Sequence, residues 1–162
     1  MLTGIRPIAA GSLAPAFSAS FRARARSSCR PRDVRKDSMT SHTAVIADDN
    51  AGMRLVARTL VEEAGWTVVA EAVDGEQAVR HALEHRPALV LMDYRMPGTD
   101  GLEATGRITA AWPQATVVVW TSTEDAATAE RFFAAGASDY IVKGDVARLR
   151  AVLAPACAGR AA

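Results

Sequence analysis

The 162-residue sequence has only two cysteines, Cys29 and Cys157, and they lie near opposite ends of the chain. This spacing suits neither a disulfide framework nor a cysteine-rich metal site. It predicts two free thiols in a reducing compartment and a cytoplasmic location. No apolar run reaches the roughly 18 residues that a membrane-spanning helix needs, so a membrane protein is not expected.

Lysine is also scarce, and Lys143 is the only lysine after residue 40. Positive charge is unevenly distributed along the chain. Residues 1–40 carry a net charge of +6, which leaves −5 for residues 41–162 because the whole chain is +1. A basic segment therefore precedes an acidic one.

Residues 1–40 show no helical or strand periodicity, and their Ala, Ser, Arg and Pro content is typical of a disordered basic extension. Three interpretations stay open for this segment. One is an organellar transit peptide, and another is a basic arm that binds nucleic acid or a membrane surface. In the third, Met39 is the true start and the preceding residues lie upstream of the native protein. The segment has no groove-reading helix, so direct DNA binding is not expected.

From residue 43 onward, short apolar runs alternate with amphipathic segments. Strands are expected at 43–47, 67–70, 88–92, 116–120 and 139–142, and helices at 51–64, 75–85, 101–111, 122–136 and 145–153. Such alternation predicts a doubly wound α/β fold, in which a parallel sheet is covered by helices on both faces. The expected domain spans residues 41–154, and residues 155–162 are expected to form a short flexible tail.

Helical spacing also predicts which side chains face the core. The expected inward residues are Met53, Val56, Leu60 and Ala64 in the first helix and Ala78, Val79, Ala82 and Leu83 in the second. Ser122, with Asp125 three residues later, resembles a capping box and is expected to begin the fourth helix.

Polar side chains follow four of the five expected strands. In chain order they are Asp48 with Asp49, Asp93, Thr121 and Lys143. The carboxyl ends of parallel strands meet at one edge of the sheet, where open α/β sheets bind their ligands. The strand at 67–70 adds no such group, which suits an edge position. The histidines at 42, 81 and 85 fall outside these strand ends and are assigned to the surface.

Clustered carboxylates repel one another, and a divalent cation together with a fixed positive charge relieves that repulsion. Carboxylate oxygens suit Mg²⁺, and Lys143 supplies the fixed charge. An Asp in this setting can act as a nucleophile toward a phosphoryl group and form an acyl phosphate. The nearby Thr121 hydroxyl can then hydrogen-bond a phosphoryl oxygen.

Residues 43–153 resemble the receiver (CheY-like) domain of two-component response regulators. The resemblance rests on Asp48-Asp49, on Asp93 with Met96-Pro97 and Gly101, on Thr121-Ser122, and on Tyr140-Ile-Val-Lys143. It implies a flavodoxin-like, five-stranded parallel sheet in the order 2-1-3-4-5 with five helices.

The resemblance further implies that Asp93 is the phosphoacceptor of a phosphorelay, fed by a histidine kinase or a histidine phosphotransfer protein. Asp49 and Asp93 would bind Mg²⁺ directly. Asp48 would act largely through water, and the backbone carbonyl of Arg95 would complete the protein ligands.

On phosphorylation, Lys143 would pair with the phosphoryl group and Thr121 would move toward it. Tyr140 would swing inward and reshape the face formed by the fourth helix, the fifth strand and the fifth helix, where a downstream protein would dock.

Few residues follow the last expected helix, so the expectation is a single-domain response regulator without an output domain. It would catalyse only its own phosphorylation and dephosphorylation and would not be a turnover enzyme. Two alternatives remain open. One is a pseudo-receiver that binds partners and never carries phosphate. The other is a Mg²⁺-dependent phosphohydrolase, although Arg95 stands where such enzymes usually need a second carboxylate.

Overall fold

A computed structural model of the protein describes residues 42–154. The expectations for residues 1–40 and 155–162, and for Cys29 and Cys157, lie outside the described residues. Within that described range, no helix has both the length and the apolar composition that crossing a membrane requires.

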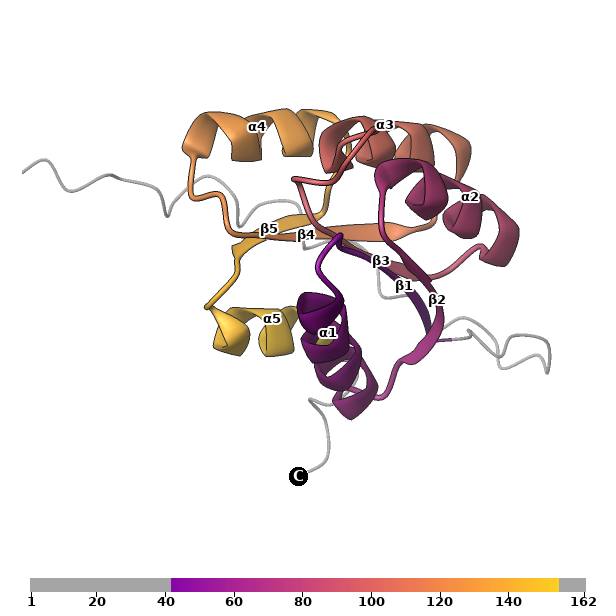
Figure 1. Cartoon of the computed structure of the whole chain (residues 1–162), viewed down its shortest axis with the longest axis vertical. Coiled ribbons are helices and arrows are strands. Elements are labelled where there is room, and N and C mark those ends of the chain that lie inside the picture. The colour runs from indigo at the N-terminus through magenta and orange to yellow at the C-terminus, as the bar shows by residue number, and fades with distance from the viewer. Residues whose placement is uncertain (1–41, 155–162) are drawn as a thin grey trace, which may run out of the picture. The chain divides into compact units, whose positions relative to one another are not determined.

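Strands and helices alternate from β1 to α5, as the sequence predicts (Figure 1). Their bounds are β1 Thr43–Ala47, α1 Ala51–Glu63, β2 Thr67–Ala72, α2 Gly75–His85, β3 Leu89–Met92, α3 Gly101–Ala111, β4 Thr116–Thr121, α4 Ala126–Ala134, β5 Asp139–Val142 and α5 Val146–Leu153. All neighbouring strands are parallel, and their order is β2-β1-β3-β4-β5. The expected flavodoxin-like topology is confirmed.

The sheet separates two helical layers, with α1 and α5 on one face and α2, α3 and α4 on the other (Figure 1). The central strand β3 serves both layers because successive side chains of a strand point to opposite faces. Leu89 and Leu91 pack in the core beneath α1 and α5, whereas Val90 and Met92 pack in the core beneath α2 and α3. All of these side chains are at most 2% exposed, as a parallel sheet buried on both faces requires.

Two of the expected inward residues are wrong. Val56 in α1 is 44% exposed and Leu83 in α2 is 42% exposed. Leu60 is buried as expected, and the other buried residues of α1 are Ala57 and Val61. Both helices bury small alanines, Ala57 in α1 and Ala78 with Ala82 in α2, so the buried face differs from the one that the largest apolar residues suggest.

The expected start of the fourth helix at Ser122 is also wrong. Asp125 is the N-cap of α4, and its carboxylate accepts hydrogen bonds from the backbone N–H (2.8 Å) and the hydroxyl (2.6 Å) of Thr128. Ser122 lies in the loop between β4 and α4. Every helix here has an Asx N-cap whose side chain accepts a backbone N–H: Asn50, Asp74, Asp100, Asp125 and Asp145.

Candidate functional site

The end of β1 places two neighbouring carboxylates in very different surroundings. The N–H of Asp48 donates to the carbonyl of Ala72 on β2 (3.1 Å), which extends the ladder past the strand. Asp48 is 2% exposed, and its Oδ1 accepts the N–H of Asn50 (2.9 Å), the residue that caps α1. Asp49 is exposed to solvent. One carboxylate is therefore held in place and the other faces the opening.

Arg54 fixes the backbone of this acidic turn, a contribution that the sequence reasoning missed. Its Nη1 donates to the carbonyls of Asp48 (2.9 Å) and Asp49 (3.2 Å), and its Nε donates to Glu71 on β2 (3.2 Å). Helical spacing shows only that Arg54 lies off the core stripe. No sequence signal predicts its contacts, because Glu71 belongs to another element.

Asp93 and Lys143 are also positioned by backbone hydrogen bonds that continue the sheet beyond the ends of its strands. The N–H of Asp93 donates to the carbonyl of Ala47 (2.8 Å), and the N–H of Lys143 donates to the carbonyl of Thr121 (2.7 Å). Lys143 Nζ lies 2.7 Å from Asp48 Oδ2 and 3.2 Å from Asp93 Oδ1. One ammonium group thus bridges two carboxylates whose side chains are 3% and 7% exposed.

The Asp93 carboxyl group has a raised pKa. Burial is the largest cause, and the nearby Asp48 charge adds to it, while the Lys143 ammonium works in the opposite direction. Asp93 Oδ1 is also buried, and the Lys143 ammonium at 3.2 Å contacts it as an ion pair while no hydrogen-bond partner satisfies it. This carboxylate therefore has capacity for a cation or for a new bond.

Thr121 and Tyr140 both contact the loop that follows β4. Thr121 is 1% exposed, and its Oγ1 accepts the N–H of Thr123 (3.4 Å). The Tyr140 hydroxyl donates to the carbonyl of Thr123 (2.7 Å), and its ring, 8% exposed, packs on Phe132 of α4 with centroids 5.7 Å apart. The two residues predicted to switch are thus joined to one segment.

An open cleft of about 540 Å³ lies over these strand ends. Its lining contains Asp48, Asp49, Asn50, Met53, Asp93, Arg95, Thr121, Ser122, Thr123 and Lys143. One carboxylate oxygen from each of Asp48, Asp49 and Asp93 lies within 4.8 Å of the others. Oxygen donors at that spacing, one of them without a hydrogen-bond partner, fit Mg²⁺. Tyr140 lies outside the lining residues and reaches the cleft only through Thr123.

The β2-β1-β3-β4-β5 sheet, with carboxylates and a lysine at its carboxyl edge, defines a receiver-type α/β protein. The profile of the response regulator receiver domain matches residues 44–154, and the chain belongs to this family. Receiver domains bind Mg²⁺ at an acidic pocket of this kind.

Three known proteins illustrate the similarity. The chemotaxis protein CheY of Bacillus subtilis is 38% identical over 103 residues, which cover 64% of this chain and 86% of CheY. The protein-glutamate methylesterase/protein-glutamine glutaminase of Natronomonas pharaonis is 44% identical over 84 residues, 52% of this chain. A two-component response regulator of the LuxR family from Aurantimonas sp. SI85-9A1 has a solved structure with a TM-score of 0.64 and 37% identity, covering 68% of this chain and 84% of that chain.

The methylesterase comparison involves only part of that relative. The match spans 24% of its length, about a quarter of the protein. The methylesterase and glutaminase activities in the relative's name are properties of that relative.

Proposed function

We propose that this receiver domain works as a phosphoacceptor in a two-component phosphorelay and that Asp93 takes the phosphoryl group. One observation carries the proposal. Asp93 is 6% exposed, carries a carboxyl oxygen without a hydrogen-bond partner, and lies 3.2 Å from the ammonium group of Lys143 in a cleft with two further carboxylates.

In the proposed step, an oxygen of Asp93 attacks the phosphorus of a phosphohistidine on a histidine kinase or histidine phosphotransfer protein. The new P–O bond forms an acyl phosphate while the P–N bond of the donor breaks. The leaving nitrogen keeps the electron pair and takes up a proton. Lys143, which bridges Asp48 and Asp93, would turn its charge toward the phosphoryl oxygens and stabilise them.

The cation called for by this chemistry is Mg²⁺, which neutralises phosphoryl oxygens when it is bound. Asp49 and Asp93 would hold it directly, Asp48 largely through water, and Arg95 through its backbone carbonyl. The spacing of the carboxylates and the place of Arg95 in the cleft lining support this assignment.

The signal would pass through Thr121 and Tyr140 to the face formed by α4, β5 and α5. A phosphoryl group on Asp93 offers new acceptors to the Thr121 hydroxyl. Movement of Thr121 would disturb Thr123, which also holds the Tyr140 hydroxyl. A downstream protein would distinguish the two arrangements of that face. No turnover of a separate substrate is expected.

Intact mass measured after incubation with acetyl phosphate tests the proposal. The full chain is expected to gain one phosphoryl group only when Mg²⁺ is present, and Asp93→Asn is expected to gain none. Asp100→Asn is a matched control, because Asp100 caps α3 and Asn caps helices equally well. An adduct that persists in Asp93→Asn, or a wild-type chain that binds Mg²⁺ but acquires no adduct from either acetyl phosphate or a phosphorylated kinase, would exclude Asp93 and favour a pseudo-receiver.

A further inference from the structure

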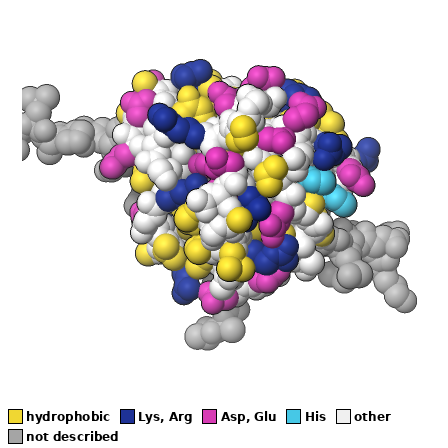
Figure 2. Space-filling view, in the orientation of Figure 1, with side chains coloured by type: hydrophobic (Ala, Val, Ile, Leu, Met, Phe, Trp, Pro, Cys, Tyr) yellow, Lys and Arg dark blue, Asp and Glu magenta, His cyan; other side chains and the backbone are white. Residues whose placement is uncertain are grey.

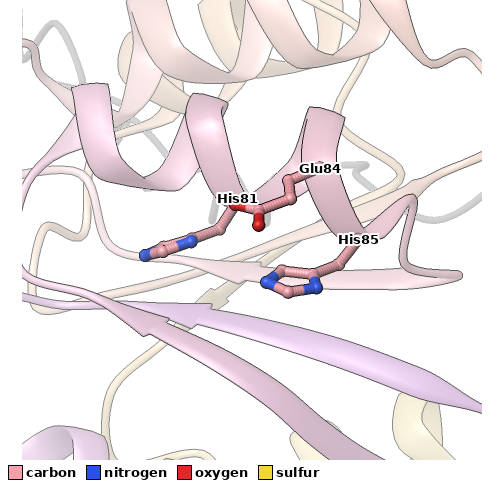
Figure 3. A group of neighbouring side chains, drawn as sticks. All are labelled: His81, Glu84 and His85. Carbon is pink, nitrogen blue, oxygen red and sulfur yellow. The ribbon is translucent and has the colours of Figure 1, made fainter.

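Three side chains with metal-ligating atoms converge on the last turns of α2. His81, Glu84 and His85 stand at positions i, i+3 and i+4, which share one face of a helix. One ligand atom from each lies within 4.8 Å of the others, and Figure 3 shows the Glu84 carboxylate between the two imidazole rings. The ring centroids are 5.8 Å apart and the ring planes differ by 29°.

His81 contains a polar atom that the protein leaves unsatisfied. Its Nδ1 is buried and has no hydrogen-bond partner, an arrangement that folded proteins avoid because it costs free energy. Among the described residues, this property is shared only with Asp93 Oδ1 and Trp120 Nε1. Coordination of a cation by the imidazole would remove the deficit.

The group is open to solvent on its other side. Glu84 and His85 are exposed, and Figure 2 shows histidine side chains at the surface beside α2, at the right of the view. The neighbouring cation Arg86 is engaged elsewhere, because its guanidinium lies over the Trp112 ring, 5.3 Å from the ring centroid. An ion from solvent can therefore reach the group.

This cluster is distinct from the carboxylate cluster around Asp93. The helix α2 begins at its cap Asp74 near the carboxyl edge of the sheet and runs back, so its last turns lie toward the opposite edge (Figure 1). The donor sets differ as well. Three carboxylates suit Mg²⁺, whereas two imidazoles and a carboxylate suit Zn²⁺ and related divalent transition metals.

We propose that His81, Glu84 and His85 bind one divalent transition-metal ion of the Zn²⁺ type. Three protein ligands would leave a fourth tetrahedral position for water or for a group from another molecule. The ion would tie together the final turns of α2, directly before Arg86, which adopts a left-handed conformation with φ of 46°.

Calorimetric titration of the full chain with Zn²⁺ tests this site. Mg²⁺ is kept in excess to occupy carboxylates, and Cys29→Ser with Cys157→Ser removes competing thiols. One Zn²⁺ per chain is expected to bind. The single variants His81→Gln and His85→Gln should each weaken binding by about tenfold or more, the loss expected when a metal site is damaged. The matched control His42→Gln and the phosphoacceptor variant Asp93→Asn should bind as the parent does.

Histidine ring resonances in NMR spectra give a second readout that needs no ligand variant. Zn²⁺ is expected to shift the ring signals of His81 and His85 and to leave those of His42 unchanged. Thermal unfolding should show a Zn²⁺-dependent rise in Tm that is absent in the His81→Gln, His85→Gln double variant. Absence of binding, equal affinity in the double variant, or shifts confined to His42 would each overturn the proposal. None of these outcomes depends on phosphorylation of Asp93.

Discussion

Asp93 is more easily ionised in the unfolded chain than in the folded protein. Its pKa is raised chiefly by burial, so the folded state binds this proton more tightly than the unfolded chain does. The free energy of unfolding therefore falls as the pH rises from the ordinary carboxyl value through the raised pKa. At neutral pH the ionised form of Asp93 therefore reduces the stability of the folded protein.

Replacing Asp93 by Asn should consequently stabilise the metal-free protein at neutral pH. The gain is expected to be on the order of 1 kcal/mol, the usual scale of a single substitution. It should shrink as the pH falls below the raised pKa, because Asp93 then becomes neutral as well. Urea unfolding of both proteins in EDTA across this pH range measures the difference. Added Mg²⁺ should narrow the difference by stabilising the wild type, and a less stable Asn variant at neutral pH would contradict the explanation.

Single residues of the site differ in how far the sequence reveals them. Asp48, Asp93 and Lys143 are predictable because each follows a buried strand, and Lys143 also stands out by the scarcity of lysine. Arg54 is not predictable, because its role depends on the carbonyl positions of the β1–α1 turn and on Glu71 from β2. Residue type and strand end are visible in a sequence, whereas the direction of a backbone carbonyl is not.

At the scale of elements, the junction between β3 and α3 is built on a close backbone approach. The N–H of Gly101 donates to the carbonyl of Tyr94 (2.9 Å), and a Cβ at position 101 would collide with the carbonyl oxygen of Asp93. The first residue of α3 therefore helps to determine where the backbone of Asp93 lies.

Gly101→Ala should destabilise the protein by about 1–3 kcal/mol, the usual cost of overpacking, and should also slow phosphoryl uptake by moving Asp93. Gly106→Ala is the matched control in the same helix, because nothing lies within 4 Å of a Cβ there. That control should raise stability by about 0.5–1 kcal/mol. Chemical denaturation and intact mass after acetyl phosphate treatment measure both effects. If Gly101→Ala and Gly106→Ala changed stability and phosphoryl uptake equally, the close backbone approach at position 101 would not be the cause of the change.

The start of α4 offers a second prediction for an element. Hydrogen bonds from Thr128 hold the pKa of Asp125 below its ordinary value, so this cap stabilises the fold above the unfolded carboxyl pKa and loses its effect as the pH falls through the lowered one. Asp125→Ala should lower Tm at neutral pH and have a smaller effect in acid. Ser122→Ala should leave Tm nearly unchanged. Thermal unfolding followed by circular dichroism distinguishes Asp125 from Ser122 as the cap.

The sequence predicts which segments form strands and which form helices. It does not predict which face of a helix is buried or where each helix begins. Apolar runs and helical periods locate all the strands and helices of residues 42–154, because each pattern arises within one element. The exposure of Val56 and Leu83 depends on how closely a helix approaches the sheet, which is decided between elements. The start of α4 after Asp125 rather than at Ser122 depends on where the loop after β4 turns, and local sequence does not contain that information.

For the whole molecule, the described residues already contain a complete sheet with both faces covered. A fragment of residues 41–154 is therefore expected to fold by itself. Its Tm should lie within about 4 °C of that of the full chain, a shift of less than about 1 kcal/mol. Differential scanning calorimetry gives the comparison, and phosphoryl uptake by the fragment provides a functional check. A fragment that unfolds at a much lower temperature would show that flanking residues contribute to the domain.

The location of the acidic cleft follows from the alternation of strands and helices and from the residues at the strand ends, whereas the strand order is implied by the resemblance to receiver domains. The cluster at the end of α2 does not follow from the sequence, although its residues are visible as His81, Glu84 and His85. Spacing on a helix shows that side chains share a face. Whether their ligand atoms converge depends on rotamers that neighbouring elements select, and a sequence does not show these rotamers.

Lys143 has a practical consequence for chemical labelling. It is the only lysine after residue 40, and its side chain is 11% exposed inside the cleft. Reagents that acylate primary amines consequently have one side-chain target across this entire stretch. Trypsin would release that target between Arg131 and Arg148, since an acylated lysine is not cleaved. The rate at which this peptide becomes acylated therefore measures how strongly Asp48 and Asp93 hold the Lys143 amine, and no probe has to be introduced.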